Sequence, residues 1–396
     1  MTVCVTGIGI VSGIGNGVEE HFEALRAGRS RMKRVSLFET RHDVLVSEVG
    51  ATNAELKQQL GLPAGRMVSR TALLGMMAAK EAVLDAGLDV NRSLRIGLVS
   101  STSVGGMDAS ECFYPGFRGD SRAGRLRQVV MHDCGAITEA IAAYLHIRGM
   151  VTTISTACSS AANAILLGCR LIRQDMLDAV VVGGTDALCK FTFNGFASLM
   201  ILDKEHCRPF DDTRAGLNLG EGAGFLVLQS EATCHRTPYA EIAGYANTND
   251  AYHQTASSPE GDGPYLAMKK ALECSGLEAG SIGYINVHGT GTPNNDESEG
   301  KAMKRLFGEA IPAFSSTKAF TGHTLGAAGG IEAVFSVLAL SRQAVFPNLN
   351  FSVPIKGLDL IPVTAYREKS GLQAVMSNSF GFGGNNTSLI FKRCGV

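Results

Sequence analysis

The chain has 396 residues, of which 45% are hydrophobic and 18% are charged, and its formal net charge is −1. This length and composition allow a large buried core and exclude a disordered protein. Because no block of like charges occurs, nothing in the sequence indicates nucleic-acid binding.

The chain starts directly on an apolar segment at residues 3–6, without the basic start and apolar core of a signal peptide. No apolar run approaches the roughly 20 residues that a membrane helix needs, so we expect no membrane span. The ten cysteines lack paired CxxC spacing, which argues against structural zinc. We expect a cytoplasmic protein whose cysteines are mostly buried, small apolar side chains.

Short apolar segments alternate with helical segments along the chain, which predicts buried strands in parallel or mixed sheets covered by helices. The predicted strands are residues 3–6, 96–100, 152–155, 179–182, 224–229, 282–287 and 388–391. Residues 105–135 differ, with weak periodicity and several aromatic and basic side chains. We interpret them as an excursion from the first half that lines a pocket or a partner surface.

Two distant stretches, residues 71–102 and 265–288, repeat one order: a helix, a terminating glycine and a buried strand. The glycines, Gly87 and Gly276, each follow the last helical turn, where a left-handed cap is expected. They lie nearly half the chain apart, so we infer a duplication.

A second correspondence concerns two predicted helices rich in small residues, 159–174 and 326–342. Cys158 precedes the first helix and His323 precedes the second. We therefore predict two related α/β halves, residues 1–240 with Cys158 and residues 241–396 with His288 and His323. In such an arrangement the catalytic cleft lies between the carboxyl ends of the strands.

The candidate chemistry centres on Cys158, which stands in a run of small residues between an apolar and an amphipathic segment. That layout is typical of a tight strand-to-helix turn, and the helix N-terminus favours a thiolate. His288 and His323 lie in glycine-rich loops, where a lone histidine is more often structural. One nucleophile with two imidazoles, however, suggests carbon–carbon bond formation on thioesters.

Seven motifs resemble those of the elongating (synthase I/II-like) β-ketoacyl-acyl carrier protein synthases of the thiolase superfamily. They are Thr-Ala-Cys158-Ser-Ser, Cys207-Arg208-Pro209-Phe210-Asp211, Gly220-Glu221-Gly222-Ala223-Gly224, His288-Gly-Thr-Gly-Thr-Pro293, Ser316-Thr317-Lys318, Gly322-His323 with Gly326-Ala-Ala-Gly329, and Asn378-Ser379-Phe380-Gly381-Phe382-Gly383-Gly384. They follow the family's order and span nearly the whole chain. The resemblance implies a duplicated thiolase-like fold, layered αβαβα with two mixed sheets.

The resemblance also implies a mechanism. The Cys158 thiolate would accept an acyl group from acyl carrier protein, and malonyl-carrier protein would then lose CO₂ and attack the acyl thioester, adding two carbons. His288 and His323 would donate hydrogen bonds to the malonyl thioester oxygen as enolate charge develops, and such a donor is worth roughly 3–4 kcal/mol. The backbone N–H groups of Cys158 and Phe382 would form a separate oxyanion hole.

Other residues take their implied roles from the same resemblance. Lys318 would position His323 and pair with Glu332. Thr290 and Thr292 would bind the amides of pantetheine.

The entrance and the acyl pocket follow by the same analogy. Phe382 would be the gate between nucleophile and malonyl pocket, and Asp250 and Thr255 match a mobile loop beside the entrance. Val104 stands at the bottom of the acyl pocket, where many relatives have a bulkier residue. Asn385 departs from the expected threonine, so the gating loop is expected to differ.

The resemblance implies no cofactor of the protein's own, because the carrier protein brings the phosphopantetheine. It implies a homodimer with the strand at Val151–Ile154 at the interface, or a heterodimer with a chain-length partner. The pathway stays open between fatty acid and polyene or polyketide synthesis; the segments 132–135 and 191–196 resemble the polyene branch.

Four alternative functions fit the sequence less well. A noncatalytic chain-length partner would lack the nucleophile, whereas Cys158 is present. A degradative thiolase needs a second cysteine in the loop that here carries Phe382, and Cys394 lies beyond it. A dinucleotide-binding site at residues 7–13 lacks the required sixth residue. A papain-like hydrolase leaves the second histidine unexplained. His132 and Cys134 lack metal-ligand spacing, so we expect them to be structural.

Overall fold

The computed structural model describes residues 1–90 and 94–395 of the chain. Within these residues, ten strands form two groups of five that share one order and one pattern of directions. The first group runs β6 (Val151–Ile154), β5 (Ile96–Ser101), β7 (Ala179–Asp186), β9 (Gly222–Ser230) and β1 (Val3–Ser12). The second runs β12 (Ala313–Ser315), β11 (Ile282–Asn286), β15 (Ala374–Gly381), β16 (Asn385–Lys392) and β10 (Ala240–Asn249).

Each group begins with three parallel strands and ends with two antiparallel pairings, so both groups are mixed. The predicted duplicated, layered α/β fold is therefore confirmed. The count of sheets needs a correction: β1 and β10 pair antiparallel at Cys4↔Glu241 and Val5↔Ala240. This short junction joins the two expected sheets into one continuous sheet.

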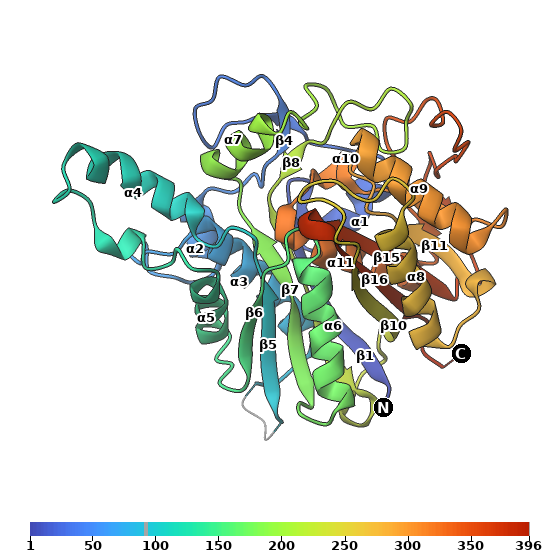
Figure 1. Ribbon diagram of the computed structural model, residues 1–396. Coiled ribbons are helices and arrows are strands. Elements are labelled where there is room, and N and C mark those ends of the chain that lie inside the picture. The colour runs from blue at the N-terminus through green and yellow to red at the C-terminus, as the bar shows by residue number, and fades with distance from the viewer. Residues whose placement is uncertain (91–93, 396) are drawn as a thin grey trace.

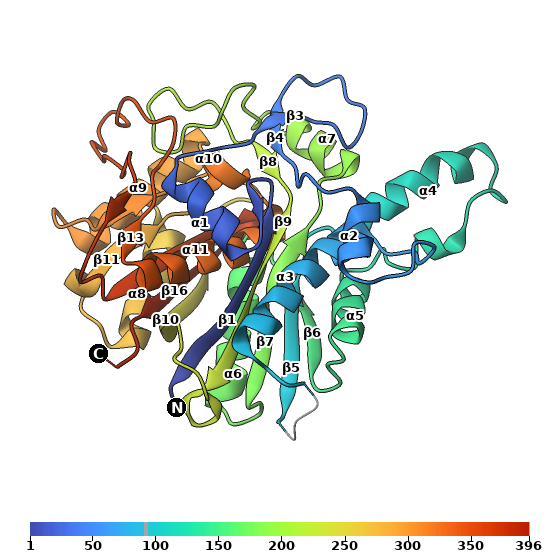
Figure 2. The same cartoon turned by 180° about the vertical axis from the view of Figure 1, so that it is seen from behind.

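Helices form three layers around this sheet (Figures 1 and 2). One outer layer packs on the first half and contains α3 (Arg70–Ala86) and α5 (Cys134–Tyr144). The other outer layer packs on the second half and contains α8 (Asp262–Ser275) and α9 (Pro293–Phe307). The middle layer, α6 (Ser160–Arg173) and α11 (Ala328–Arg342), shares one apolar core with strands of both halves.

Small residues let the middle layer pack closely. A Cβ atom on Gly329 would lie 2.8 Å from the backbone nitrogen of Ala162, and one on Gly330 would lie 2.4 Å from the carbonyl oxygen of Gly224. The two middle helices thus contact each other, and α11 contacts β9, at backbone distance. This explains why the sequence places small residues there, as predicted.

The duplication also appears in the capping of α3 and α8. Gly87 and Gly276 end these helices with φ of 59° and 67°, the left-handed conformation that was predicted for both. The seven predicted strands are all present, with ends shifted by a few residues. The division at residue 240 stays a prediction; Ala240 is the first residue of β10.

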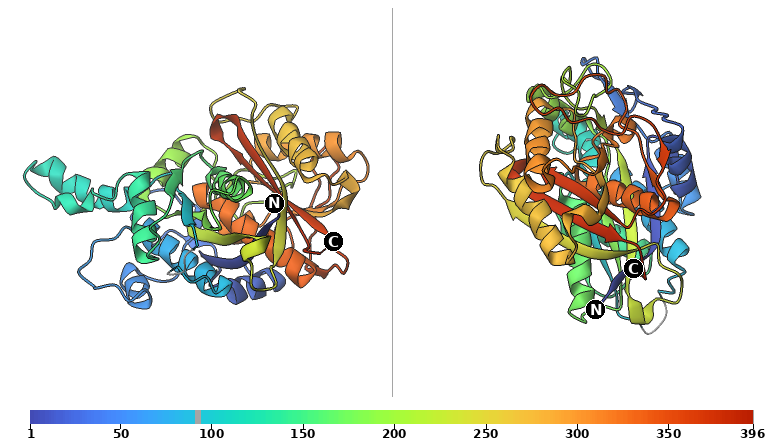
Figure 3. Two further views of the ribbon diagram at one scale, coloured as in Figure 1. Left: turned by 90° about the horizontal axis from the view of Figure 1, so that it is seen from below. Right: turned by 90° about the vertical axis from the view of Figure 1, so that its right-hand side faces the viewer.

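The predicted excursion carries α4 (Met107–Gly119), which projects from the body at one end (Figure 3). No residue of α4 is buried. The other short helices and strands are α1 (Val18–Arg26), α2 (Asn53–Gln59), α7 (Lys190–Ser198), α10 (Lys318–Thr321), β2 (Gly15–Asn16), β3 (Lys33–Arg34), β4 (Leu45–Ser47), β8 (Leu219–Gly220), β13 (Ala344–Val345) and β14 (Arg367–Glu368). Short 3-10 turns are η1 (Leu126–Gln128), η2 (Glu231–Thr233), η3 (Ala279–Ser281), η4 (Leu325–Ala327) and η5 (Phe382–Gly384).

By length and composition alone, the stretch Leu325–Arg342 resembles a membrane span, and it is the one such stretch in the described part of the chain. It is 89% buried inside the protein, where α11 forms the centre of the middle layer.

Candidate active site

Cys158 lies on a tight turn between β6 and α6, as its sequence context predicted. The residue before it, Ala157, has φ of +52°, a left-handed conformation that costs a non-glycine residue roughly 1–2 kcal/mol. The turn places Cys158 two residues before the first residue of α6. Its side chain is 5% exposed, so the nucleophile sits at the bottom of a site rather than on the surface.

His288 lies in the loop that follows β11, and a buried carboxylate holds that loop. Glu299 of α9 accepts the backbone N–H groups of His288 and Gly289, both at 2.9 Å, and the side-chain amide of Asn378 at 3.1 Å. Burial raises the pKa of Glu299 to about 7 although these donors lower it.

His323 lies between α10 and η4, where its backbone is anchored to the strand region of the first half. Its N–H donates to the carbonyl of Asn218 at 2.7 Å, and its carbonyl accepts from Gly220 at 3.0 Å. The N–H of Leu325 donates to the ring Nδ1 at 3.1 Å and fixes the orientation of the ring.

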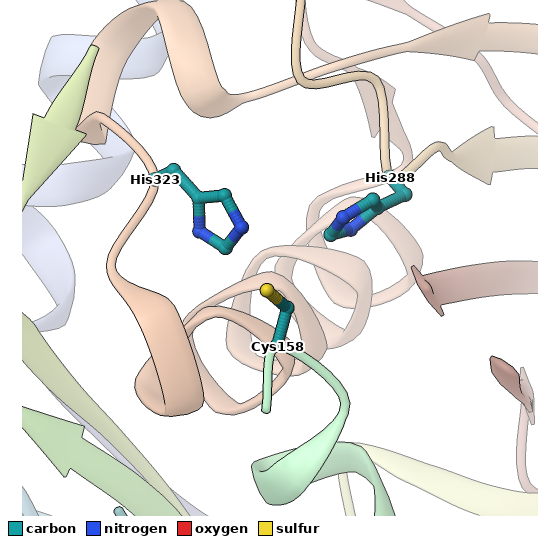
Figure 4. A group of neighbouring side chains, drawn as sticks. All are labelled: Cys158, His288 and His323. Carbon is teal, nitrogen blue, oxygen red and sulfur yellow. The ribbon is translucent and has the colours of Figure 1, made fainter. Parts of the chain in front are cut away.

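These three side chains converge on one space from separate segments (Figure 4). The Cys158 sulfur and one ring nitrogen each of His288 and His323 lie within 4.8 Å of one another, and all three residues are buried. The two imidazole rings are 5.5 Å apart at an interplanar angle of 86°. The predicted set of nucleophile and two histidines is thus brought together.

Lys318 lies against His288 and not against His323, which corrects its expected role. The Nζ atom donates to the carbonyl of His288 at 2.6 Å and lies 3.3 Å from its Nδ1, while among the described contacts no hydrogen bond joins it to His323. The expected ion pair between Lys318 and Glu332 is present and buried, with the two side chains 2% and 3% exposed. The prediction failed because α10 points Lys318 toward the loop after β11.

The contacts at Nδ1 decide the tautomer of both histidines. An ammonium group and a backbone N–H are donors only, so Nδ1 of His288 and Nδ1 of His323 must accept. The ring hydrogen of each neutral imidazole is therefore on Nε2. Both rings offer a hydrogen-bond donor and no free acceptor.

Burial and charge keep both imidazoles neutral. Burial and the nearby Lys318 lower the pKa of His288 and of His323 well below the ordinary value. A neighbouring imidazole lowers that of His288 further. The site therefore presents two neutral N–H donors at physiological pH.

Burial of the Cys158 thiol opposes the predicted preference for thiolate. Burial raises its pKa to about 11. Lys318 and the backbone N–H groups of Phe382 and Cys158 lower the pKa, but burial outweighs them. The oxyanion hole expected at these two N–H groups stays a prediction.

A cavity of about 300 Å³ opens onto the three side chains. Its wall includes the three predicted threonines and the gate phenylalanine: Thr255, Thr290, Thr292 and Phe382. Val104 is not in this wall; it packs in a neighbouring apolar cluster that includes Phe196 and Ile201. The N–H groups of Val104 and of Gly326, in the loop that follows His323, both donate to the buried carboxylate of Asp186.

Comparisons with known proteins agree with this geometry. The family description "Beta-ketoacyl synthase, N-terminal domain" matches residues 1–233, and "Beta-ketoacyl synthase, C-terminal domain" matches residues 239–352. The chain belongs to the beta-ketoacyl synthase family. The predicted acyltransferase of this family, with its thiolase-like fold, is therefore confirmed.

Individual relatives cover the whole chain. A 3-oxoacyl-[acyl-carrier-protein] synthase 2 of Staphylococcus aureus (strain COL) is 35% identical over 99% of this chain and 98% of its own length. The solved ishigamide ketosynthase/chain length factor is similar with a TM-score of 0.93 at 31% identity, covering 100% of this chain and 99% of that one. A type II polyketide ketosynthase solved with its acyl-carrier protein, AntDE:AntF, has a TM-score of 0.86 at 25% identity, covering 99% of each chain.

Aromatic stacking and loop contacts hold Phe382 in this synthase site. The Phe382 ring stacks on Phe196 with centroids 5.9 Å apart at 19°. The predicted neighbouring loop holds the gate: the N–H of Gly383 donates to the carbonyl of Gln254 at 2.8 Å, and the N–H of Asp250 donates to that of Gly384 at 3.2 Å.

Sequence reasoning missed two polar residues of this synthase. Glu299 accepts hydrogen bonds from the His288 loop. The carbonyl of Asn218 accepts the N–H of His323, and the Asn218 side chain binds three backbone groups of residues 203–207. Neither lies in a pattern that marks it, because each acts on a segment distant in sequence. His132 binds Ser110 at 2.8 Å, and Cys134 begins α5.

The thiol and two imidazoles are also a donor set that zinc accepts. The hydrogen bonds oppose such a role, because a metal on Nε2 needs the ring proton on Nδ1. In this synthase a backbone N–H and the Lys318 ammonium point at those Nδ1 atoms. The cluster is better suited to binding an anionic oxygen than a cation.

Proposed function

We propose that the protein catalyses decarboxylative Claisen condensation of malonyl-acyl carrier protein with an acyl group held on Cys158. The product is a β-ketoacyl-carrier protein two carbons longer. The observation that carries the proposal is the pair of neutral Nε2–H donors on His288 and His323, which face one space together with the Cys158 thiol.

In the first step, the Cys158 sulfur attacks the carbonyl carbon of the acyl-carrier thioester. A carbon–sulfur bond forms to Cys158 as the bond to the carrier's sulfur breaks. The thiol proton is transferred to the leaving thiolate, so the exchange is neutral in protons. The N–H groups of Cys158 and Phe382 stabilise the oxyanion of the tetrahedral intermediate.

In the second step, the malonyl group loses CO₂, and the electron pair of the broken bond forms an enolate. The enolate oxygen accepts from His288 and His323. Because both rings are neutral and hold their hydrogens on Nε2, they stabilise this charge without taking up a proton. Neither ring offers the acceptor nitrogen that a hydrolytic cysteine–histidine pair requires, so the site favours condensation over hydrolysis.

In the third step, the enolate carbon attacks the acyl carbonyl on Cys158. A carbon–carbon bond forms, the carbon–sulfur bond breaks, and the sulfur leaves as a thiolate that regains a proton from water. The pair Lys318 and Glu332 acts through His288, whose ring and carbonyl Lys318 holds, and so has a positioning role.

The carrier protein would supply the phosphopantetheine, and the enzyme would use no cofactor or metal of its own. Thr290 and Thr292 support this arm, because their hydroxyls lie 2.8 Å apart in the cavity wall, where pantetheine amides would pass. Thr255 lies at the same entrance, and Val104 would limit the acyl end. The acyl chain would belong to fatty acid synthesis or to polyene or polyketide-type synthesis, the latter supported by the likeness to the ketosynthase of a type II PKS.

A second copy of the chain is the proposed partner at the β6 edge. Within the described residues β6 pairs with β5 alone, and its residues are half-buried. The projecting excursion exposes Tyr114 of α4 at 60% and Leu126 of η1 at 75%. Apolar surface of this kind is normally covered. A heterodimer with a chain-length partner is the alternative. A purified protein whose native mass equals one chain would exclude the homodimer.

We also propose a cytoplasmic location. All ten cysteines lie in the described residues and all are free thiols, which suits a reducing compartment.

The alternative function, a noncatalytic chain-length partner, is disfavoured by the same site, since it has no need of Cys158. The test is a mass-spectrometric assay with purified protein, malonyl-carrier protein and a panel of saturated and polyunsaturated acyl-carrier proteins. We expect an acyl adduct on Cys158 and a β-ketoacyl product. Absence of both, with authentic substrates, would leave the partner-subunit function. Equal turnover of short saturated chains would exclude a specialised polyene enzyme.

A further inference from the structure

Asn385, the departure from the family pattern, is the acceptor in a closed ring of side-chain hydrogen bonds. Its Oδ1 accepts from Nδ2 of Asn163 at 2.9 Å and from Nδ2 of Asn247 at 2.7 Å. Asn247 also donates to Thr387 Oγ1 at 2.8 Å, and Thr387 donates to Oδ1 of Asn163 at 2.9 Å. Since each donor has a matching acceptor, the ring is satisfied in one orientation of every amide.

This ring joins three elements, α6, β10 and β16, beside the active site. Asn163 lies on α6, one turn after the nucleophile, Asn247 lies on β10, and Asn385 and Thr387 begin β16, directly after the gate loop. Ser159, the residue after Cys158, adds a hydroxyl contact to Asn385 Oδ1 at 2.7 Å. The C-terminal end of the gate loop is therefore tied to the first turn of the nucleophile's helix.

The other side of the gate loop is held differently. It relies on backbone contacts to Gln254 and Asp250 and on the side-chain amide of Asn249, which donates to Gly383 at 2.8 Å. Asn249 and Gln254 are exposed, and so is Gly383. Exposed contacts open more readily than a satisfied network, and in the ring only Asn247 is exposed. The loop thus has one weakly held side and one fixed end.

The fixed end matters because the gate loop supplies half of the oxyanion hole. The backbone of Gly381 packs on the nucleophile turn, so that a Cβ there would lie 3.1 Å from the Thr156 carbonyl and 3.3 Å from the Cys158 nitrogen. The next N–H, that of Phe382, lowers the pKa of the Cys158 thiol, and both residues line the same cavity. A shift of the loop end by a fraction of an ångström would move this donor out of register.

We propose that Asn385 is a positioning residue, which through the Asn163–Thr387–Asn247 ring keeps the Phe382 N–H aligned with Cys158 when the gate opens on its exposed side. This inference rests on the proposed function. It assigns Asn385 to the steps that use the oxyanion hole, acyl transfer to Cys158 and condensation. It excludes malonyl decarboxylation, which uses His288 and His323.

The test compares Asn385→Leu, which removes the acceptor at similar size, with Asn385→Asp, which keeps it. In Asn385→Leu we expect acyl transfer to Cys158 and condensation to slow by about 10- to 100-fold, part of the effect of losing an oxyanion donor. Malonyl decarboxylation by the unacylated enzyme should stay within about twofold of the wild type, and Asn385→Asp should transfer acyl groups within about threefold.

Asn247→Ala is the second variant, because Asn247 is exposed and its loss leaves the fold intact even where Asn385→Leu fails to fold. It removes one of the two amide donors, so we expect a smaller loss in acyl transfer, about 3- to 10-fold, again without loss of decarboxylation. Asn16→Ala, an exposed asparagine on β2, is the control and should change neither reaction.

Equal slowing of acyl transfer and decarboxylation in Asn385→Leu would overturn the proposal, as would an Asn385→Asp enzyme as slow as Asn385→Leu. A wild-type protein that neither accepts acyl groups nor condenses would instead refute the proposed function, and this inference with it.

Discussion

The starts of α6 and α11 occupy equivalent places in the two halves and yet carry different chemistry. Both lie in the middle layer, and both are preceded by a non-glycine residue with positive φ, Ala157 at +52° and Leu325 at +54°. Cys158 stands directly at the start of its helix, whereas η4 separates His323 from α11.

The free backbone N–H groups explain both uses. The N–H of Cys158, before α6, and that of Phe382, in η5, lower the pKa of the Cys158 thiol. Near α11 the N–H of Leu325 points at the ring of His323 and keeps a proton off Nδ1. A backbone N–H thus favours negative charge at the thiol in one half and fixes a neutral donor in the other.

The largest effect is expected from removing the nucleophile. Cys158→Ala should lower condensation by at least about 10³-fold, because no other thiol faces the cavity among the described residues. Cys169→Ala, a buried cysteine on the same helix, is the matched control and should condense normally. Condensation is measured by mass spectrometry. A Cys158→Ala enzyme that condenses at the wild-type rate would show that Cys158 is not the nucleophile.

The second prediction concerns His323, which lies before α11: His323→Ala should slow malonyl decarboxylation. Loss of one enolate donor should slow malonyl decarboxylation by about 10²- to 10³-fold, and His288→Ala should act similarly. Transfer of the acyl group to Cys158, read by intact-protein mass, should change by only a few-fold. The exposed His235→Ala is the control. An equal loss of acyl transfer would mean that acyl transfer and decarboxylation are not assigned separately to Cys158 and to the histidines.

The pH dependence of alkylation sharpens the electrostatic part of the comparison. Because burial raises the pKa of Cys158 to about 11, its thiolate is scarce at pH 7 and increases as pH rises. The rate of modification by iodoacetamide should therefore climb roughly tenfold per pH unit from pH 7 to 10. A plateau near pH 7, with mapping to Cys158, would show that the helix start outweighs burial.

The smallest effect concerns the contact between the two helices. Gly329→Ala places a Cβ 2.8 Å from both the Ala162 nitrogen and the Ser379 hydroxyl, so we expect about 1–3 kcal/mol less unfolding free energy in urea. Gly135→Ala in α5 meets open space and serves as the control, with no loss of stability. Equal stability of both variants would show that the helices yield at this contact.

The sequence predicted those structural features that depend on residues close together in the chain. The turn at Cys158, the left-handed caps at Gly87 and Gly276 and the strands with unbroken apolar runs were all found where expected. β10 and β15 were missed, because polar and small residues interrupt their apolar pattern and their burial comes from neighbouring strands.

The site was predicted in its members but not in all its contacts. Motifs located Cys158, His288 and His323, whereas the partner of Lys318 depends on how α10 meets the loop after β11. The protonation of Cys158 likewise depends on the depth of its burial, which only the assembled layers fix. Glu299 was missed for the same reason.

The short junction between β1 and β10 has a consequence for how the chain can be divided. Only two residue pairs cross there, while the core around α6 and α11 holds the halves together. The segment between β9 and β10, residues 231–239, is mostly exposed or half-buried. A cut in it would give two polypeptides, one with the nucleophile and one with both histidines. Their recombination through the middle layer would make catalysis a direct reporter of fragment assembly.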